Sequence, residues 1–158
     1  MCLPFKSSVD TSYPSKDIID EAIVFYAHIM EADDYPIEGA ADKTLIYLFL
    51  FMTECLRQCL YVKDLETAKN KLIKLVDGKT LPVPGDVGFP FNKDFGSPKN
   101  DFEEYLLRSY LMQLERECLD RFLDIVFRAP EKPDHDPLEY YLSFATKPCL
   151  GGRLKLDL

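Results

Sequence analysis

Residues 40–62, AADKTLIYLFLFMTECLRQCLYV, contain the stretch that decides the fold. Every residue from 45 to 52 is apolar, whereas a helix on a protein surface has one apolar stripe and one polar side. The helical pattern continues without Gly or Pro, which favours a helix over a buried strand. Asp42 and Lys43 precede the run and Glu54 follows it, so it is shorter than the roughly 20 apolar residues of a bilayer span. The sequence therefore predicts a hydrophobic helix that other segments enclose, and no membrane insertion.

Four further helices are predicted around it from their apolar periodicity. Each begins at an Asp or Asn whose side chain can accept hydrogen bonds from the first backbone N–H groups. In the longest, we expect Glu103 to reach back to the cap Asn100 as in a capping box. The expected ranges are 17–30, 64–77, 100–127 and 136–144. The predicted fold class is all-α, with five helices of which one is enclosed by the others.

Charged residues on these helices are expected to face solvent, where carboxylates are surface charge rather than catalytic groups. A polar strip in the second half of the hydrophobic helix indicates that its end reaches the surface, and comprises Glu54, Arg57 and Gln58. Spacing of four residues in the long helix predicts two ion pairs, Arg116 with Asp120 and Glu117 with Arg121.

Residues 79–99, KTLPVPGDVGFPFNKDFGSPK, form a long irregular stretch with four prolines and three glycines, which we call the strap. Loops of more than about 15 residues without secondary structure are uncommon in compact domains and are usually functional or disordered. Apolar residues that can anchor it favour order, namely Leu81, Val83, Val87, Phe89, Phe91 and Phe95. A rigid loop on a helical scaffold can bind a partner or simply cover the core. Composition leaves both possibilities open.

The 158 residues are expected to form a single all-helical domain, with an extended N-terminal arm at 1–16 and a loose C-terminal tail at 149–158. The net charge of −8 repels phosphate backbones, so nucleic acid is not an expected partner. Five cysteines are an odd number and no signal sequence is recognised, which indicates a cytosolic protein with reduced thiols.

Motifs for chemistry are weak. Gly78-Lys79-Thr80 resembles the end of a phosphate-binding loop, but the glycine required five residues earlier is Ile73. Cys55 and Cys59 lie one helical turn apart without a second pair of metal ligands, so we interpret them as buried small apolar residues. The two histidines, His28 and His135, give little support for a Cys/His nucleophile. No catalytic, cofactor-binding or metal-binding residue is predicted.

Two hypotheses about function remain at this point. The chain is a non-catalytic subunit of an assembly, or it is a small cytosolic helical enzyme with an unrecognised active site. The lack of histidine, metal and phosphate motifs favours the subunit.

Several strings resemble one known family, subunit 3 of the actin-related protein 2/3 complex. They are DIIDEAI at 17–23, ADKTLIY at 41–47, ECL at 54–56, LPVPGDVGFPFN at 81–92 and RSYLMQLERE at 108–117. The order and spacing match from about Leu3 to Phe127, and the Pro-x-Pro-Gly-x-x-Gly-Phe-Pro segment is the most specific part. At the C-terminus, Thr146-Lys147-Pro148 and the following LGGRLKLDL replace the basic ending of the family.

The resemblance implies a five-helix subunit without enzymatic activity and without a cofactor, because the actin-related subunits of that assembly hold its ATP. Its implied partners are actin-related protein 3, the other members of a seven-subunit complex, and the actin filament on which the complex nucleates a branch. The implied location is the cytoplasm and its cytoskeleton. We expect the strap to supply the partner-binding residues, namely Pro82, Pro84, Gly85, Gly88, Phe89, Pro90, Phe91 and Asn92.

Overall fold

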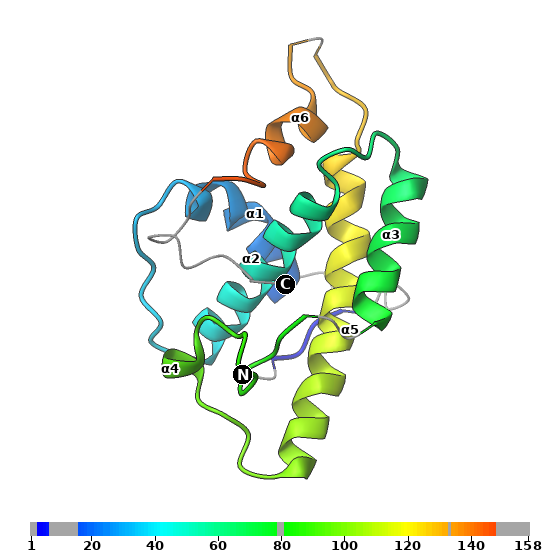
Figure 1. The fold of residues 1–158 in the computed structure, drawn as a ribbon. Helices are drawn as coiled ribbons and strands as arrows, with labels where there is room; N and C mark the ends of the chain where they lie inside the picture. The colour runs from blue at the N-terminus through cyan, green and yellow to red at the C-terminus, as the bar shows by residue number, and fades with distance from the viewer. Residues whose placement is uncertain (1–2, 7–15, 79–80, 133, 148–158) are drawn as a thin grey trace.

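The computed structural model describes residues 3–6, 16–78, 81–132 and 134–147 (Figure 1). Apart from an isolated bridge between Lys132 and His135, the secondary structure of these residues is helical. The helices are α1 (Ile18–Met30), α2 (Ala40–Gln58), α3 (Leu65–Asp77), α4 (Asn92–Phe95), α5 (Asp101–Val126) and α6 (Pro137–Leu142). The all-α prediction is confirmed. The count of five was wrong, because the strap contains the additional four-residue helix α4.

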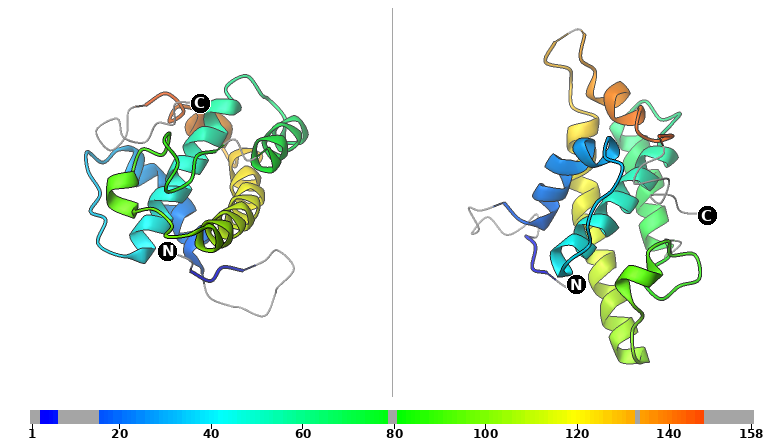
Figure 2. Two further views of the ribbon diagram at one scale, coloured as in Figure 1. Left: turned by 60° about the horizontal axis from the view of Figure 1, so that its bottom comes forward. Right: turned by 90° about the vertical axis from the view of Figure 1, so that its left-hand side faces the viewer.

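Helix α2 crosses the middle of the molecule, as the sequence predicts (Figures 1 and 2). Every residue from 44 to 56 is buried, and Leu48 and Phe49 have no exposed surface. Helices α1, α3, α5 and α6 all contact α2. Because its whole circumference is apolar, only contact on all sides removes that surface from water.

Tyr26 of α1 joins three of these helices at one end of the core. Its ring lies edge-on to Phe122 of α5 at 5.7 Å and to Phe144, just beyond α6, at 6.0 Å between ring centroids. Its hydroxyl is 2.9 Å from Thr53 Oγ1 in α2. A buried tyrosine is stable there because its hydroxyl has a partner.

The predicted helix starts are correct, with one difference in detail. Asp17 accepts hydrogen bonds from the N–H groups of Ile19 and Asp20, both at 3.1 Å. Asn100 accepts from Glu103 N–H at 2.9 Å, but the Glu103 carboxylate accepts from Lys99 N–H rather than from Asn100. The expected capping box is therefore only half formed, because the Glu103 carboxylate binds the N–H group one residue before the cap.

The expected polar strip on α2 was wrong at Glu54. This side chain is 3% exposed, and its carboxylate accepts from Gln58 Nε2 at 2.7 Å and from Arg57 at 3.2 Å. Arg57 and Gln58 are half-buried, so they cover the carboxylate instead of extending into solvent with it.

One of the two predicted ion pairs in α5 was also wrong. Arg116 pairs with Asp77 of α3 at 2.5 Å, and Asp120 lies 3.9 Å from Lys69 of α3. Because α3 packs along α5, each side chain has a closer partner on the other helix (Figure 1). The pair between Glu117 and Arg121 is present, with 3.0 Å between them.

The two chain ends are described only in part. Residues 3–6 of the predicted arm are described, whereas 1–2 and 7–15 lie outside the described residues. The predicted loose tail, 149–158, lies outside them altogether.

Candidate partner-binding surface

Aromatic side chains hold the described part of the strap, residues 81–99, against the core. Phe89 and Phe91 are 3% and 1% exposed. The ring centroid of Phe89 lies 5.0 Å from that of Phe95 and 6.3 Å from that of Tyr47 in α2. Leu81 and Val83 of the strap are buried as well. The inner side of the strap therefore covers the core.

Val87 was wrongly expected to be one of these anchors. Its side chain is fully exposed, at 105% of the reference value. The alternation of apolar residues could not distinguish it from Val83, because the backbone turns between them at residues 83–86, where Asp86 N–H donates to Val83 O over 2.9 Å.

Polar contacts fix the turn of the strap to α5. The guanidinium of Arg108 donates to both carboxylate oxygens of Asp86, at 2.6 and 3.3 Å. The same carboxylate accepts from Val83 N–H at 2.9 Å. Burial alone would raise the pKa of Asp86, but these hydrogen bonds outweigh it and lower the pKa. Asp86 thus stays charged and connects the strap to α5.

Asn92 closes the turn from the other side. Its Oδ1 accepts from Gly85 N–H at 2.8 Å, and its Nδ2 donates to Asp86 O at 2.5 Å. Gly85 has φ of +105°, a conformation that other residues rarely adopt, and a Cβ there would lie 3.0 Å from Pro98 Cδ. The sequence Pro-Gly-Asp therefore gives the strap one defined shape.

The structure separates the eight predicted partner-binding residues into two sets. Pro84, Phe89 and Phe91 are buried, while Pro82 and Asn92 are half-buried. Gly85, Gly88 and Pro90 are exposed, together with Val87. These four exposed residues, which we call the outer strap, are the part of the loop that a partner can reach without unfolding it.

A second apolar surface was not recognised in the sequence. Phe102, Tyr105 and Leu106, in the first turns of α5, are 68%, 68% and 48% exposed. Their spacing of three and four residues places them on one side of the helix, away from the buried Leu111 and Leu114. Tyr105 lines a cavity together with Leu81 and Val83, so this side of α5 lies beside the strap. The spacing was the signal that could have revealed it.

A cavity of about 110 Å³ lies between α3, the strap and α5. Its lining is mainly apolar, but it includes Arg108 and Glu115 of α5. Glu115 is 5% exposed and accepts a short hydrogen bond from the hydroxyl of Tyr47. Burial raises the pKa of Glu115 to about 7, although the Tyr47 hydrogen bond acts to lower it. The expectation that carboxylates sit on solvated faces was therefore wrong for Glu115, as it was for Glu54 and Glu117.

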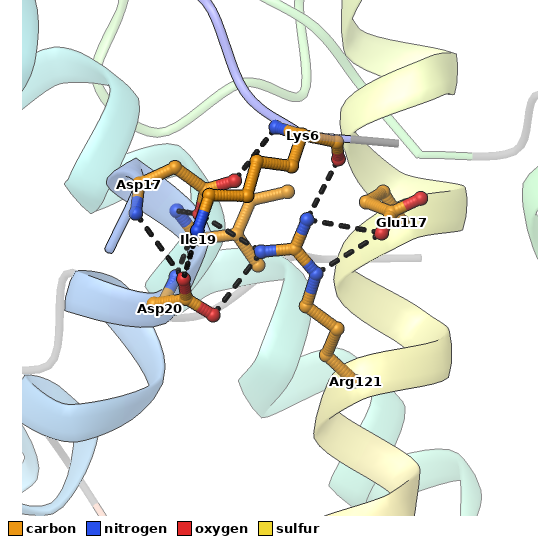
Figure 3. A network of polar contacts seen from close by, with 6 residues as sticks. All are labelled: Lys6, Asp17, Ile19, Asp20, Glu117 and Arg121. Atoms are coloured by element: carbon orange, nitrogen blue, oxygen red, sulfur yellow. Dashed lines mark hydrogen bonds and ion pairs between the residues drawn. The ribbon is translucent and has the colours of Figure 1, made fainter. Parts of the chain in front are cut away.

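Arg121 of α5 holds the described N-terminal segment in place (Figure 3). Its guanidinium donates to Asp17 Oδ1 at 2.8 Å, to Asp20 Oδ1 at 3.1 Å and to the carbonyl oxygen of Lys6 at 2.7 Å. Glu117, one turn away, accepts from Arg121 Nε at 3.0 Å. Burial alone would raise the pKa of Asp17, but the hydrogen bonds from Arg121 and from backbone N–H groups lower it. The segment 3–6 is thus attached to both α1 and α5.

The cysteines that we interpreted as apolar core residues are buried. Cys55 and Cys59 are each 1% exposed and free, and burial raises the pKa of Cys59 to about 11. Among the described residues, no three His, Cys, Asp or Glu side chains are arranged to hold a metal ion. Within the same part of the chain, none of the helices has the length and apolarity that crossing a membrane requires.

Comparison with known proteins gives this helical scaffold a family. The family model described as P21-Arc, the ARP2/3 complex ARPC3 (21 kDa) subunit, matches residues 2–154. The chain belongs to the P21-Arc family. P21-Arc proteins are structural subunits of a complex rather than enzymes, which decides between the two hypotheses from the sequence in favour of the subunit.

Individual relatives of this P21-Arc chain are identical to it at about a third of the aligned positions. Probable actin-related protein 2/3 complex subunit 3 of Caenorhabditis elegans is 34% identical over 131 residues, which cover 83% of this chain and 70% of the relative. The subunit 3 of Arabidopsis thaliana is 33% identical over 92% of this chain and 83% of the relative. That of Schizosaccharomyces pombe is 34% identical over 96% and 87%, respectively. The resemblance inferred from the strap and helix strings is confirmed.

Proposed function

We propose that this chain is a non-catalytic subunit of the actin-related protein 2/3 complex that contacts the actin-related protein 3 subunit and the mother filament. In this role it contributes to the nucleation of branched actin filaments and works in the cytoplasm, at the actin cytoskeleton. Membership of the P21-Arc family supports its place in the complex. The contacts themselves are argued from the surface of the chain.

The observation that carries the proposal is the rigid outer strap. Val87 is fully exposed although it is apolar, and the turn beneath it is fixed by Arg108 and Asn92. Exposed apolar residues that gather on one surface indicate an interface, and Phe102, Tyr105 and Leu106 of α5 add to Val87 here. Preformed surfaces bind with a smaller loss of conformational entropy, so such a turn suits a permanent interface.

The neighbouring face of α5 extends this surface. Phe102 and Tyr105 are the kind of large apolar residues that are enriched at interfaces, and both are 68% exposed in the isolated chain. We assign the outer strap and this face to one contact with actin-related protein 3. The buried strap residues Phe89 and Phe91 then serve the contact indirectly, by holding the outer strap in shape.

A charge at the tip of the strap tests the proposal. Val87→Glu places a carboxylate at a fully exposed position, so the chain should fold with wild-type stability. It should nevertheless co-purify less actin-related protein 3, and complexes that contain it should nucleate fewer branches. Tyr61→Glu is the matched control, since Tyr61 is 95% exposed just beyond α2 and outside this surface.

Equal recovery of actin-related protein 3 with wild type, Val87→Glu and Tyr61→Glu would exclude the outer strap from the interface. A loss with both variants would show that added negative charge, rather than position, weakens assembly. Only a loss confined to Val87→Glu agrees with the proposal.

A further inference from the structure

The residues that line the cavity between α3, the strap and α5 range from exposed to buried. Four of its lining residues follow one side of α5, and their exposure falls from Tyr105, at 68%, through the half-buried Ser109 and Met112 to Glu115, at 5%. Tyr105, the exposed residue of this lining, also belongs to the surface assigned above to a partner. Glu115 is the most buried of the four residues.

The cavity lining is mainly apolar and contains one acidic residue. Leu75 and Val76 of α3, Leu81 and Val83 of the strap, and Leu111 and Met112 of α5 line the walls. Glu115 is the one carboxylate among the lining residues that the structure describes. The cation at the wall, Arg108, is already bound by Asp86 and by Glu104, at 2.6 and 2.9 Å. The cavity therefore combines apolar walls with one acidic group.

We propose that this cavity receives a lysine side chain of a partner protein, with its aliphatic stem along the apolar walls and its ammonium group at the carboxylate of Glu115. The inference rests on the proposed function, because it requires a partner protein at this surface. Lysine combines a long apolar stem with a compact charge at its end, which matches the apolar walls and the single carboxylate of the cavity. The net charge of −8 also favours a basic partner surface.

The contacts of Glu115 favour lysine over arginine. The hydroxyl of Tyr47 already donates to Oε1 of Glu115. An arginine side chain binds a carboxylate best through both oxygens in a planar fork, whereas an ammonium group needs one. The remaining oxygen, Oε2, is sufficient for lysine.

Burial of Glu115 makes the binding depend on pH. Because its pKa is raised to about 7, the carboxyl is largely protonated at pH 6 and largely charged at pH 8. Burial raises the pKa values of Tyr47 and Cys55 in α2 and of Cys118 in α5 well above this window. The hydrogen bonds between Asp86 and Arg108 lower the pKa of the former and raise that of the latter. Among these groups, Glu115 is the one that changes charge between pH 6 and pH 8.

Affinity measurements on the complex test the inference. The chain would be combined with the other subunits of the complex at pH 8 and at pH 6, as wild type and as Glu115→Gln, which keeps the size and an acceptor for Tyr47. At pH 8 we expect Glu115→Gln to bind at least about 30-fold more weakly, since it leaves a buried ammonium group without its counter-charge. At pH 6 the difference should shrink, because the wild-type carboxyl is then protonated.

Glu54→Gln is the matched control, because Glu54 is also a buried glutamate but lies in α2, outside the cavity. This variant should bind like the wild type. A carbodiimide that joins carboxylates directly to amines should also link wild-type Glu115 to a lysine of another subunit. Assembly with unchanged affinity for Glu115→Gln at both pH values, or without that cross-link, would overturn the lysine inference and leave the proposed function standing. Failure of the wild-type chain to assemble would overturn both.

Discussion

The guanidinium of Arg121 donates a 2.8 Å hydrogen bond to Asp17, although the two residues are 104 positions apart in the chain. Asp17 caps α1 and is 8% exposed at its side chain, so one carboxylate orients a helix and binds a cation of α5 at the same time. Arg121 also binds the carbonyl oxygen of Lys6, so the first described residues depend on the same side chain (Figure 3). This arrangement makes Arg121 a point where three segments meet.

Replacing Arg121 by methionine should destabilise the fold by about 2–4 kcal/mol. The buried carboxylates of Asp17 and Glu117 would stay charged but would lose the guanidinium that pairs with both of them. Arg116→Met is the control, since the side chains of Arg116 and Asp77 are 56% and 50% exposed. Exposed pairs contribute at most about 1 kcal/mol. Urea unfolding measures both, and equal losses would contradict the role given to Arg121.

Glu115 should make the chain less stable as pH rises. Its folded pKa of about 7 exceeds the ordinary value of 4.5, so between these pH values the folded state binds a proton that the unfolded state has lost. Stability therefore falls as pH rises through this window, by about 2–4 kcal/mol in total. Glu115→Gln should match the wild type near pH 4.5 and exceed it at pH 8, as measured by urea unfolding at the two pH values. A variant less stable than the wild type at pH 8 would show that the charged carboxylate is stabilised instead.

The turn of the strap should tolerate alanine at Gly88 but not at Gly85. Gly85 has φ of +105°, and a Cβ would lie 3.0 Å from Pro98, so Gly85→Ala should cost about 1–3 kcal/mol. At Gly88 the nearest atom to a Cβ is 3.7 Å away, an ordinary contact, and the change should stay within about 0.5 kcal/mol of the wild type. Thermal unfolding of the two variants gives the comparison. Identical unfolding midpoints would contradict the conformation described for this turn.

The enclosed helix makes the fold sensitive at Leu48, which has no exposed surface. Leu48→Ala should cost about 2–5 kcal/mol through the cavity that it leaves, and Leu48→Asp should prevent folding because it buries an unpaired charge. Val87→Ala is the control, since the side chain of Val87 is fully exposed and its truncation leaves no cavity. Circular dichroism and thermal unfolding distinguish the three, and a Leu48→Asp chain with wild-type stability would exclude the enclosed position of α2.

The central helix and the helix starts could be predicted from the sequence because each is a local property. Eight successive apolar residues have only one stable environment, and Asp17, Asp64 and Asn100 act on N–H groups within three positions of themselves. The same locality explains the correct pair of Glu117 and Arg121, which lie one turn apart.

The errors concern partners that are distant in the sequence. Arg116 binds Asp77, 39 positions away, and Glu115 binds Tyr47, 68 positions away. Helical periodicity places a side chain on a face, but it does not say which other helix covers that face. For this reason the buried carboxylates, and with them the acidic cavity, could not be predicted from the sequence.

The strap was predicted as ordered and as a partner-binding segment, and its inward and outward residues could not be separated. Val83 and Val87 have the same chemistry, yet one is buried and the other fully exposed. The difference arises at the turn of residues 83–86, which reverses the chain between them. The partner-binding assignment itself stays a prediction.

Purification of the tagged chain from its native cell tests the central claim most directly. If the chain is a structural subunit, the chain and its companions should together form a set of seven proteins that includes actin-related proteins 2 and 3. Recovery of the folded chain alone, or of a set without an actin-related protein, would contradict the account.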